Sequence, residues 1–192
     1  MKKLVALCLM IFSLVVVTGC SSGIMGNSKS SKSFFTEPGL VAKAISDLKE
    51  TPELKGKDIQ VFQNVLINDA DGIGNMIDIN VLVPGSNDKV NNYKFQNGKW
   101  SKPSPVQITG DGDMADNVMP IDSIDYNKVT DIYKAAEEKA KTIENGKVKK
   151  SLIYIYYIDD HKYNAYINIE GSREKYTAKF DAQGNLLEMK KD

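Results

Sequence analysis

Residues 151–158 read SLIYIYYI, and this stretch restricts the kind of sheet that the chain can form. Successive side chains of a β-strand point to opposite faces. The first face would carry Leu152, Tyr154, Tyr156 and Ile158, and the second would carry Ile153, Ile155 and Tyr157. A strand covered by a helix on one side is usually polar on its other side, whereas this strand is apolar on both. We therefore expect its second face either to be buried by another part of the fold or to be an open surface that binds a partner.

The residues around this strand predict a helix followed by an antiparallel meander. Upstream, apolar residues recur at helical spacing, and they are Val129, Ile132, Tyr133, Ala136, Ala140 and Ile143. Asp125 would cap this helix, and Asn145 and Gly146 would end it. Downstream, residues 163–169 alternate between apolar and polar side chains, and residues 173–192 predict a hairpin. One helix on one face of such a sheet is an α+β arrangement.

The first half of the chain carries a similar pattern. A helical apolar face is formed by Leu40, Val41, Ala44, Ile45 and Leu48, with Thr36 as the expected cap. At an offset of 90 positions, Gly56 falls on Gly146, and residues 77–79 fall on 167–169. These matches predict an internal duplication, and two unrelated helix-plus-hairpin modules are the alternative. The predicted fold class is therefore α+β, with two repeated units, each a helix packed on a three- to four-stranded antiparallel β-meander.

Five segments follow from this reading of the chain. They are a lipoprotein signal peptide at 1–19, a flexible tether at 20–33, a first unit at 34–108, a linker at 109–122 and a second unit at 123–192. The tether is rich in Ser, Gly, Lys and Asn, which is typical of flexible coil. The linker is rich in Pro, Gly and Asp, which favours a connection between units.

The N-terminus predicts export and a lipid anchor. A short basic start precedes an apolar run that is too short to span a bilayer, and this is the pattern of a secretory signal. The run ends in VTGC at residues 17–20, which resembles a bacterial lipoprotein signal. The resemblance implies cleavage after Gly19, thioether lipidation of Cys20 and a mature chain held to a membrane of the bacterial cell envelope. An ordinary signal peptide with an incidental cysteine is the alternative.

Composition excludes several classes of function. The chain has 25 basic and 25 acidic residues, and this balance argues against nucleic-acid binding, which favours a basic stripe. Its two cysteines are Cys8 and Cys20. The first would be removed and the second acylated, so we expect no disulfide, no catalytic thiol and no structural zinc site. We predict no cofactor, and the fold should depend on its apolar core.

The C-terminal part resembles a known family. Residues 125–192, with the closing stretch YTAKFDAQGNLLEMKKD, are similar to a PepSY domain, and YKFQNGKWSKP at 93–103 looks like a more degenerate copy of its ending. Two such units in tandem resemble β-lactamase-inhibitor-protein-like lipoproteins. The resemblance implies an envelope protein associated with peptidase inhibition or protein binding rather than with catalysis. No individual functional residue is carried over, because the visible motif is structural.

Three polar features are candidate sites of chemistry. NDADGIGN at 68–75 has acids like a calcium loop, but Ile73 and Asn80 occupy positions where such a loop needs ligands, so we interpret it as a tight turn. The acidic stretch at 110–116 lacks a further carboxylate at a recognisable spacing. His161 follows two aspartates in a predicted turn, without a nucleophile motif beside it. We therefore predict no metal site, no catalytic residue and no enzyme.

Aromatic residues are the best candidates for binding. Tyrosine and tryptophan are enriched at protein interfaces because they combine apolar area with a polar tip. The candidate partner-binding residues are Tyr154, Tyr156, Tyr166, Trp100 and Tyr93. The sequence thus predicts a lipid-anchored envelope protein that binds a protein or peptide partner, such as a peptidase, through its sheet. The alternative is a structural or stress-related envelope lipoprotein without a dedicated ligand site.

Overall fold

The computed structural model describes residues 32–110 and 112–192 of the chain. The predicted signal peptide, Cys20 and the tether up to residue 31 lie outside the described residues, as does Asp111 of the acidic stretch. Within the described ranges, no helix is long and apolar enough to cross a bilayer.

Two α-helices and a set of antiparallel strands make up the described part of the chain. The helices are α1 (Leu40–Lys49) and α2 (Val129–Ala140). The strands are β1 (Gln60–Ala70), β2 (Gly74–Leu82), β3 (Val90–Gln96), β4 (Lys99–Trp100), β5 (Ser104–Val106), β6 (Val118–Pro120), β7 (Lys147–Tyr157), β8 (Lys162–Glu170), β9 (Lys175–Asp181) and β10 (Leu186–Lys191). Three short 3-10 helices are η1 (Met114–Asn117), η2 (Ile121–Ser123) and η3 (Tyr126–Lys128).

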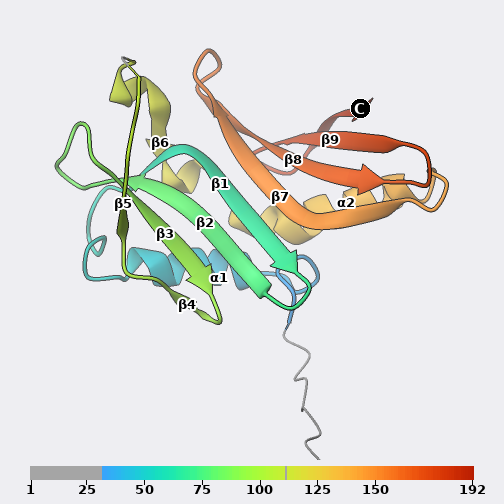
Figure 1. The fold of residues 1–192 in the computed structure, drawn as a ribbon, viewed down its shortest axis with the longest axis horizontal. Coiled ribbons are helices and arrows are strands. Elements are labelled where there is room, and N and C mark those ends of the chain that lie inside the picture. Colours follow the sequence, from blue (N-terminus) through green and yellow to red (C-terminus); the bar gives the residue numbers. More distant parts are fainter. Residues whose placement is uncertain (1–31, 111) are drawn as a thin grey trace, which may run out of the picture. The chain divides into compact units, whose positions relative to one another are not determined.

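All ten strands of residues 32–110 and 112–192 belong to one sheet. Its order is β10-β9-β8-β7-β1-β2-β3-β4, while β5 pairs with β3 and β6 with β1. Both helices lie behind the sheet in Figure 1, on the same face. The prediction of two repeated helix-on-meander units is therefore wrong, because β1 pairs with β7 and joins the strands of the two halves into a single sheet.

The join is an ordinary antiparallel ladder. Residues 64–68 of β1 lie opposite residues 151–155 of β7 in continuous register. A strand at the edge of a sheet presents unpaired backbone groups that bind another strand. Each half taken alone would leave such an edge at β1 or at β7. In the joined sheet, the backbone groups of these two strands form hydrogen bonds with each other. The halves meet edge to edge and share one hydrophobic core.

A β-bulge lets β1 pair with two strands along one edge. The register of β1 shifts between Val61 and Val65, where Gln63 has a φ of 59°. Before the bulge, residues 60–62 pair with 118–120 of β6, and after it β1 pairs with β7. Bulges of this kind bend a strand and increase its twist. Part of the segment predicted as a linker thus forms a strand of the sheet.

The helices keep the faces that the sequence predicted. The buried residues of α1 are Val41, Ala44, Ile45 and Leu48, and those of α2 include Val129, Ile132, Tyr133, Ala136 and Ala140. Of the other predicted members, Leu40 is only partly buried and Ile143 lies beyond the end of α2. The predicted cap Thr36 is wrong, since Gly39 is the N-cap of α1. Asp125 instead caps the 3-10 turn before α2, where its Oδ1 accepts from the Asn127 N–H at 3.1 Å.

Gly146 is required where the chain leaves α2. A Cβ at this position would lie 2.2 Å from the carbonyl oxygen of Ala140, far inside van der Waals contact. The chain can therefore turn from the end of α2 into β7 only because this residue has no side chain. The predicted end of the helix at Asn145 and Gly146 is nevertheless wrong, because α2 already ends at Ala140 and a turn carries the chain from there to Gly146.

Candidate functional site

The face of the sheet opposite the helices carries a row of side chains with an apolar centre. The register aligns one residue from each of seven strands, from β10 across to β3, and they are Glu188, Lys179, Tyr166, Ile153, Leu66, Asp78 and Lys94. We call this set the cross-sheet row. Its three central residues are uncharged, and each end carries a cation and an acid. Protein interfaces commonly have such an arrangement of apolar core and polar rim.

Two tyrosines define the centre of this face. The hydroxyls of Tyr157 and Tyr166 are hydrogen-bonded at 2.6 Å, and the Nζ of Lys179 lies 5.6 Å from the centre of the Tyr157 ring. Tyr157 is 38% exposed. Partial burial and the hydrogen bond to Tyr157 raise the pKa of Tyr166 above its ordinary value, so the Tyr166 phenol stays neutral at physiological pH.

The five tyrosine and tryptophan candidates do not come together. Tyr93, Tyr154 and Tyr156 point to the helix side and are buried. Trp100 is partly buried against Phe95 and donates its Nε1 proton to the carbonyl oxygen of Ala44 at 2.7 Å. Of the five, Tyr166 lies on the open face.

Sequence reasoning placed Ile153 on the second face of its strand, but it missed Leu66 and the charged members of the cross-sheet row. Leu66 and Ile153 lie on different halves of the chain but are direct neighbours across the β1–β7 ladder. The alternation of apolar residues in 151–158 signalled an apolar second face. It gave no sign that β1 would continue this face.

A cluster of phenols lies inside the core. Burial raises the pKa of Tyr126, Tyr154 and Tyr163 well above the ordinary tyrosine value. The Tyr163 hydroxyl donates to the carbonyl oxygen of Val61 at 3.4 Å. The hydroxyls of Tyr126 and Tyr154 have no hydrogen-bond partner in the part of the chain that the structure describes.

NDADGIGN forms the corner between β1 and β2, as predicted. Asn75 accepts from the Phe34 N–H at 2.8 Å and donates to the Lys32 carbonyl oxygen at 2.6 Å. Asp69 accepts from the Ser33 hydroxyl and pairs with Lys150 at 3.3 Å. The polar residues of this turn therefore hold the first described residues of the chain against the sheet.

The candidates for metal or acid–base chemistry have structural contacts. His161 lies in the β7–β8 turn with a φ of 47°, and its Nδ1 is 2.9 Å from the Tyr156 hydroxyl. Asp113 accepts from the Ala115 N–H and caps η1. Among the residues with described positions, no three His, Cys, Asp or Glu side chains are grouped so as to hold a metal ion.

Comparisons with known proteins give a fold but no family. No protein-family model matches the chain, so the PepSY resemblance finds no support there. No curated protein matches either. The crystal structure of a "putative lipoprotein" from Clostridium difficile 630 is similar, with a TM-score of 0.56 and 16% identity over 84% of this chain and 97% of that one. At this identity the likeness shows a shared fold over nearly the whole of the other protein.

Proposed function

We propose that the chain is a lipid-anchored protein of the bacterial envelope that binds a protein or peptide partner through the open face of its sheet and is not an enzyme. The N-terminal pattern ending in Cys20 supports the anchor. The similar fold of a protein that is itself named a lipoprotein agrees with it. Stable attachment needs more than one acyl chain or a second signal, and lipidation of this kind supplies chains without a spanning helix.

The cross-sheet row is the observation that carries the binding proposal. Leu66, Ile153 and Tyr166 make a continuous apolar centre, and Tyr157 extends it with a second ring. The helices cover the other face of the sheet (Figure 1). Aromatic residues contribute strongly to interface energies because they bury a large area with little loss of side-chain entropy. The charges at both ends of the row favour a partner that also offers both signs, such as a folded protein or a mixed-charge peptide.

The hydrogen bonds that the polar side chains already make within the fold support a non-enzymatic function. Asp69 and Asn75 bind residues 33 and 34, and His161 contacts the hydroxyl of Tyr156. An acid–base catalyst instead needs a polar group within hydrogen-bond reach of a substrate in a cleft. The polar groups of Asp69, Asn75 and His161 instead form hydrogen bonds within the protein.

Photo-crosslinking in the native envelope tests the proposal. A photoreactive residue replaces Tyr166 in one strain and Lys134, on the exposed face of α2, in another. We expect a discrete crosslinked species from position 166 and none from position 134. The substitution Ile153→Lys, directly opposite Tyr166, should abolish it, whereas Leu187→Lys on exposed β10 should not. Equal crosslinking at both positions, or none at 166, would leave the sheet face without a partner and would refute the proposal.

A further inference from the structure

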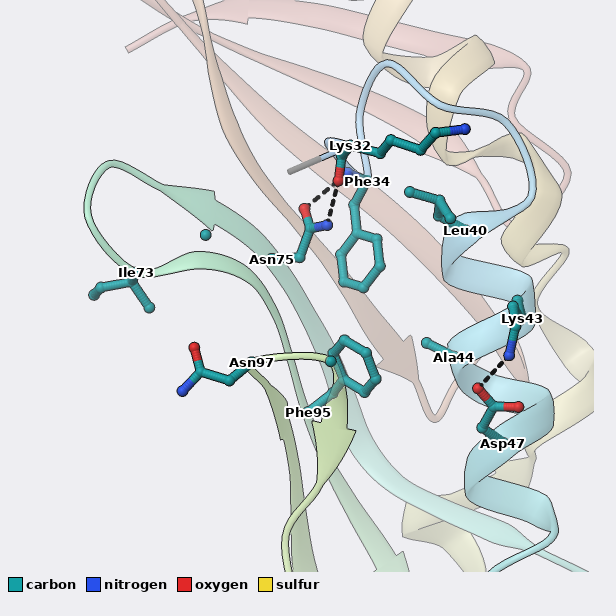
Figure 2. A pocket seen from close by; sticks show the side chains of 12 residues that line it. Lys32, Phe34, Leu40, Lys43, Ala44, Asp47, Ile73, Asn75, Phe95 and Asn97 are labelled. Carbon is teal, nitrogen blue, oxygen red and sulfur yellow. Dashed lines mark hydrogen bonds and ion pairs between the residues drawn. The ribbon is translucent and has the colours of Figure 1, made fainter. Parts of the chain in front are cut away.

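A hollow lies at one end of the layer between α1 and the sheet. It has a volume of about 470 Å³, within the usual range for ligand sites. Figure 2 shows Leu40 and Ala44 of α1 on one side, the rings of Phe34 and Phe95 in the middle, and Ile73 and Asn97 from two hairpin turns on the other side. We call this hollow the α1 slot.

The floor of the α1 slot is aromatic and aliphatic. The centres of the Phe34 and Phe95 rings are 5.7 Å apart. Behind Phe95 lies Trp100, at 5.4 Å between ring centres. Ile73 stands at the mouth and is 49% exposed. Phe34 and Phe95 are themselves already buried, so the apolar surface that a ligand would cover is that of Ile73 and Leu40. Burying it is favourable at about 25 cal/mol per Å².

Most polar groups around the α1 slot are already paired. Both ends of the Asn75 amide bind the backbone of residues 32 and 34. Lys43 pairs with Asp47 at 2.7 Å, and Lys32 with Glu37 at 3.0 Å. A ligand rich in hydrogen-bonding groups would have to break these contacts or leave its own groups unpaired, which costs free energy. The slot therefore favours a ligand that offers no hydrogen bonds along its length.

We propose that the α1 slot binds an acyl chain of a membrane lipid. A hydrocarbon chain needs no polar partners and is narrow enough to lie between a helix and a sheet. The membrane as its source rests on the proposed anchor, because Lys32 lines the slot and is only about a dozen residues from Cys20 along the chain. The chemistry of the slot itself does not depend on the anchor.

Trp100 supplies a reporter for the test. It is the single tryptophan of the chain, and it contacts two residues of the slot, Phe95 by its ring and Ala44 by its Nε1. The native lipoprotein is reconstituted into vesicles of phosphatidylcholine with brominated acyl chains, since bromine quenches tryptophan at short range. We expect quenching relative to vesicles of the same lipid without bromine.

Two matched substitutions locate the quencher. Leu40→Asp places a charge in the wall of the slot at the first residue of α1, where an acid suits the helix dipole. It should weaken binding of the brominated chain about tenfold, equivalent to about 1.4 kcal/mol, and the quenching should fall accordingly. Leu187→Asp makes the same change at a 53% exposed site on β10 and should leave quenching intact. If Leu40→Asp lowers the helical signal in circular dichroism, exposed Ile73→Asp takes its place.

The following results would overturn the proposal that the α1 slot binds a membrane acyl chain. No quenching, or equal quenching in Leu40→Asp and wild type, overturns the proposal. A second arm adds brominated stearate to the Cys20→Ala full chain without vesicles. Quenching there but not in vesicles overturns the membrane lipid as the source. Flotation of the vesicles reports attachment separately, so a failed anchor, which contradicts the proposed function, is not confused with an empty slot.

Discussion

Removing the hydroxyl of Tyr154 should stabilise the protein. The ring lies in the core with no exposed surface, 6.2 Å from the ring of Tyr126. Its hydroxyl has no partner among the described residues. Tyr154→Phe keeps the ring and its aromatic neighbour and deletes only the unpaired oxygen. The substitution thus isolates the cost of one buried polar group.

The expected gain follows from two opposing terms. A buried donor left without a partner costs about 1–3 kcal/mol. Deleting the oxygen leaves a void of about 15 Å³, which costs about 0.4 kcal/mol at about 24 cal/mol per Å³. The free energy of unfolding should therefore rise by about 1–2 kcal/mol. Most core substitutions destabilise, so even the sign is informative.

Urea unfolding, followed by circular dichroism and by the fluorescence of Trp100, measures the change. With a slope of about 2 kcal/mol per molar urea, the midpoint should rise by about 0.5–1 M at constant slope. Tyr163→Phe is the matched control. Its hydroxyl donates to the Val61 carbonyl oxygen, so the same deletion should lower the free energy of unfolding by about 0.5–1 kcal/mol.

A loss of stability in Tyr154→Phe would refute this reasoning. It would mean that the hydroxyl has a partner beyond the described protein atoms, such as an ordered water. Equal effects of the two substitutions would also contradict it, because the contrast between a paired and an unpaired hydroxyl would then have no energetic consequence.

Three further predictions concern the anchor, the alkaline limit of stability and the N-terminal contacts. Cys20→Ala should move the protein from the membrane fraction to the soluble fraction, and its retention in membranes would contradict the lipid anchor. Because burial raises the folded-state pKa of Tyr126, Tyr154 and Tyr163, their contribution to stability is complete below the unfolded pKa of about 10 and is lost above it. Unfolding then releases up to three protons, and the free energy of unfolding should fall by up to about 4 kcal/mol per pH unit. The phenolate absorbance comes from all nine tyrosines of the chain, and ionisation of all nine before the protein unfolds would disprove this. Asn75→Ala should cost about 1–2 kcal/mol through the lost contacts to residues 32 and 34, whereas Asp71→Ala in the same turn should cost less than about 0.5 kcal/mol in the same urea assay.

Local periodicity was enough to predict the two α-helices and the long strands of the second half, with their inward faces. Ala44 and Ile132 recur with their neighbours at helical spacing, and both are buried as expected. In β8, Ala165 and Ile167 alternate with polar residues and also point inward. These predictions hold because the period of the side chains depends on the backbone geometry of the element itself.

Lateral strand order could not be predicted in this way. Alternation fixes which face of a strand is apolar, but it does not say which strand lies beside it. The pairing of β1 with β7 joins residues about ninety positions apart, and it depends on a bulge at Gln63 that has no clear sequence signal. For the same reason, the two faces of 151–158 could be separated, but the sequence did not say which of them the helices cover.

The apolar second face of β7 now has a physical explanation. β7 is a central strand of the joined sheet, with β8 on one side and β1 on the other. Its inward side chains, including Tyr154, complete the core under the helices, while Ile153 meets Leu66 on the open face. In two separate units, Ile153 would lie at the edge strand of one sheet and Leu66 at the edge strand of the other, so the apolar centre would not be continuous. The proposed binding surface thus exists only because the halves of the chain share one sheet.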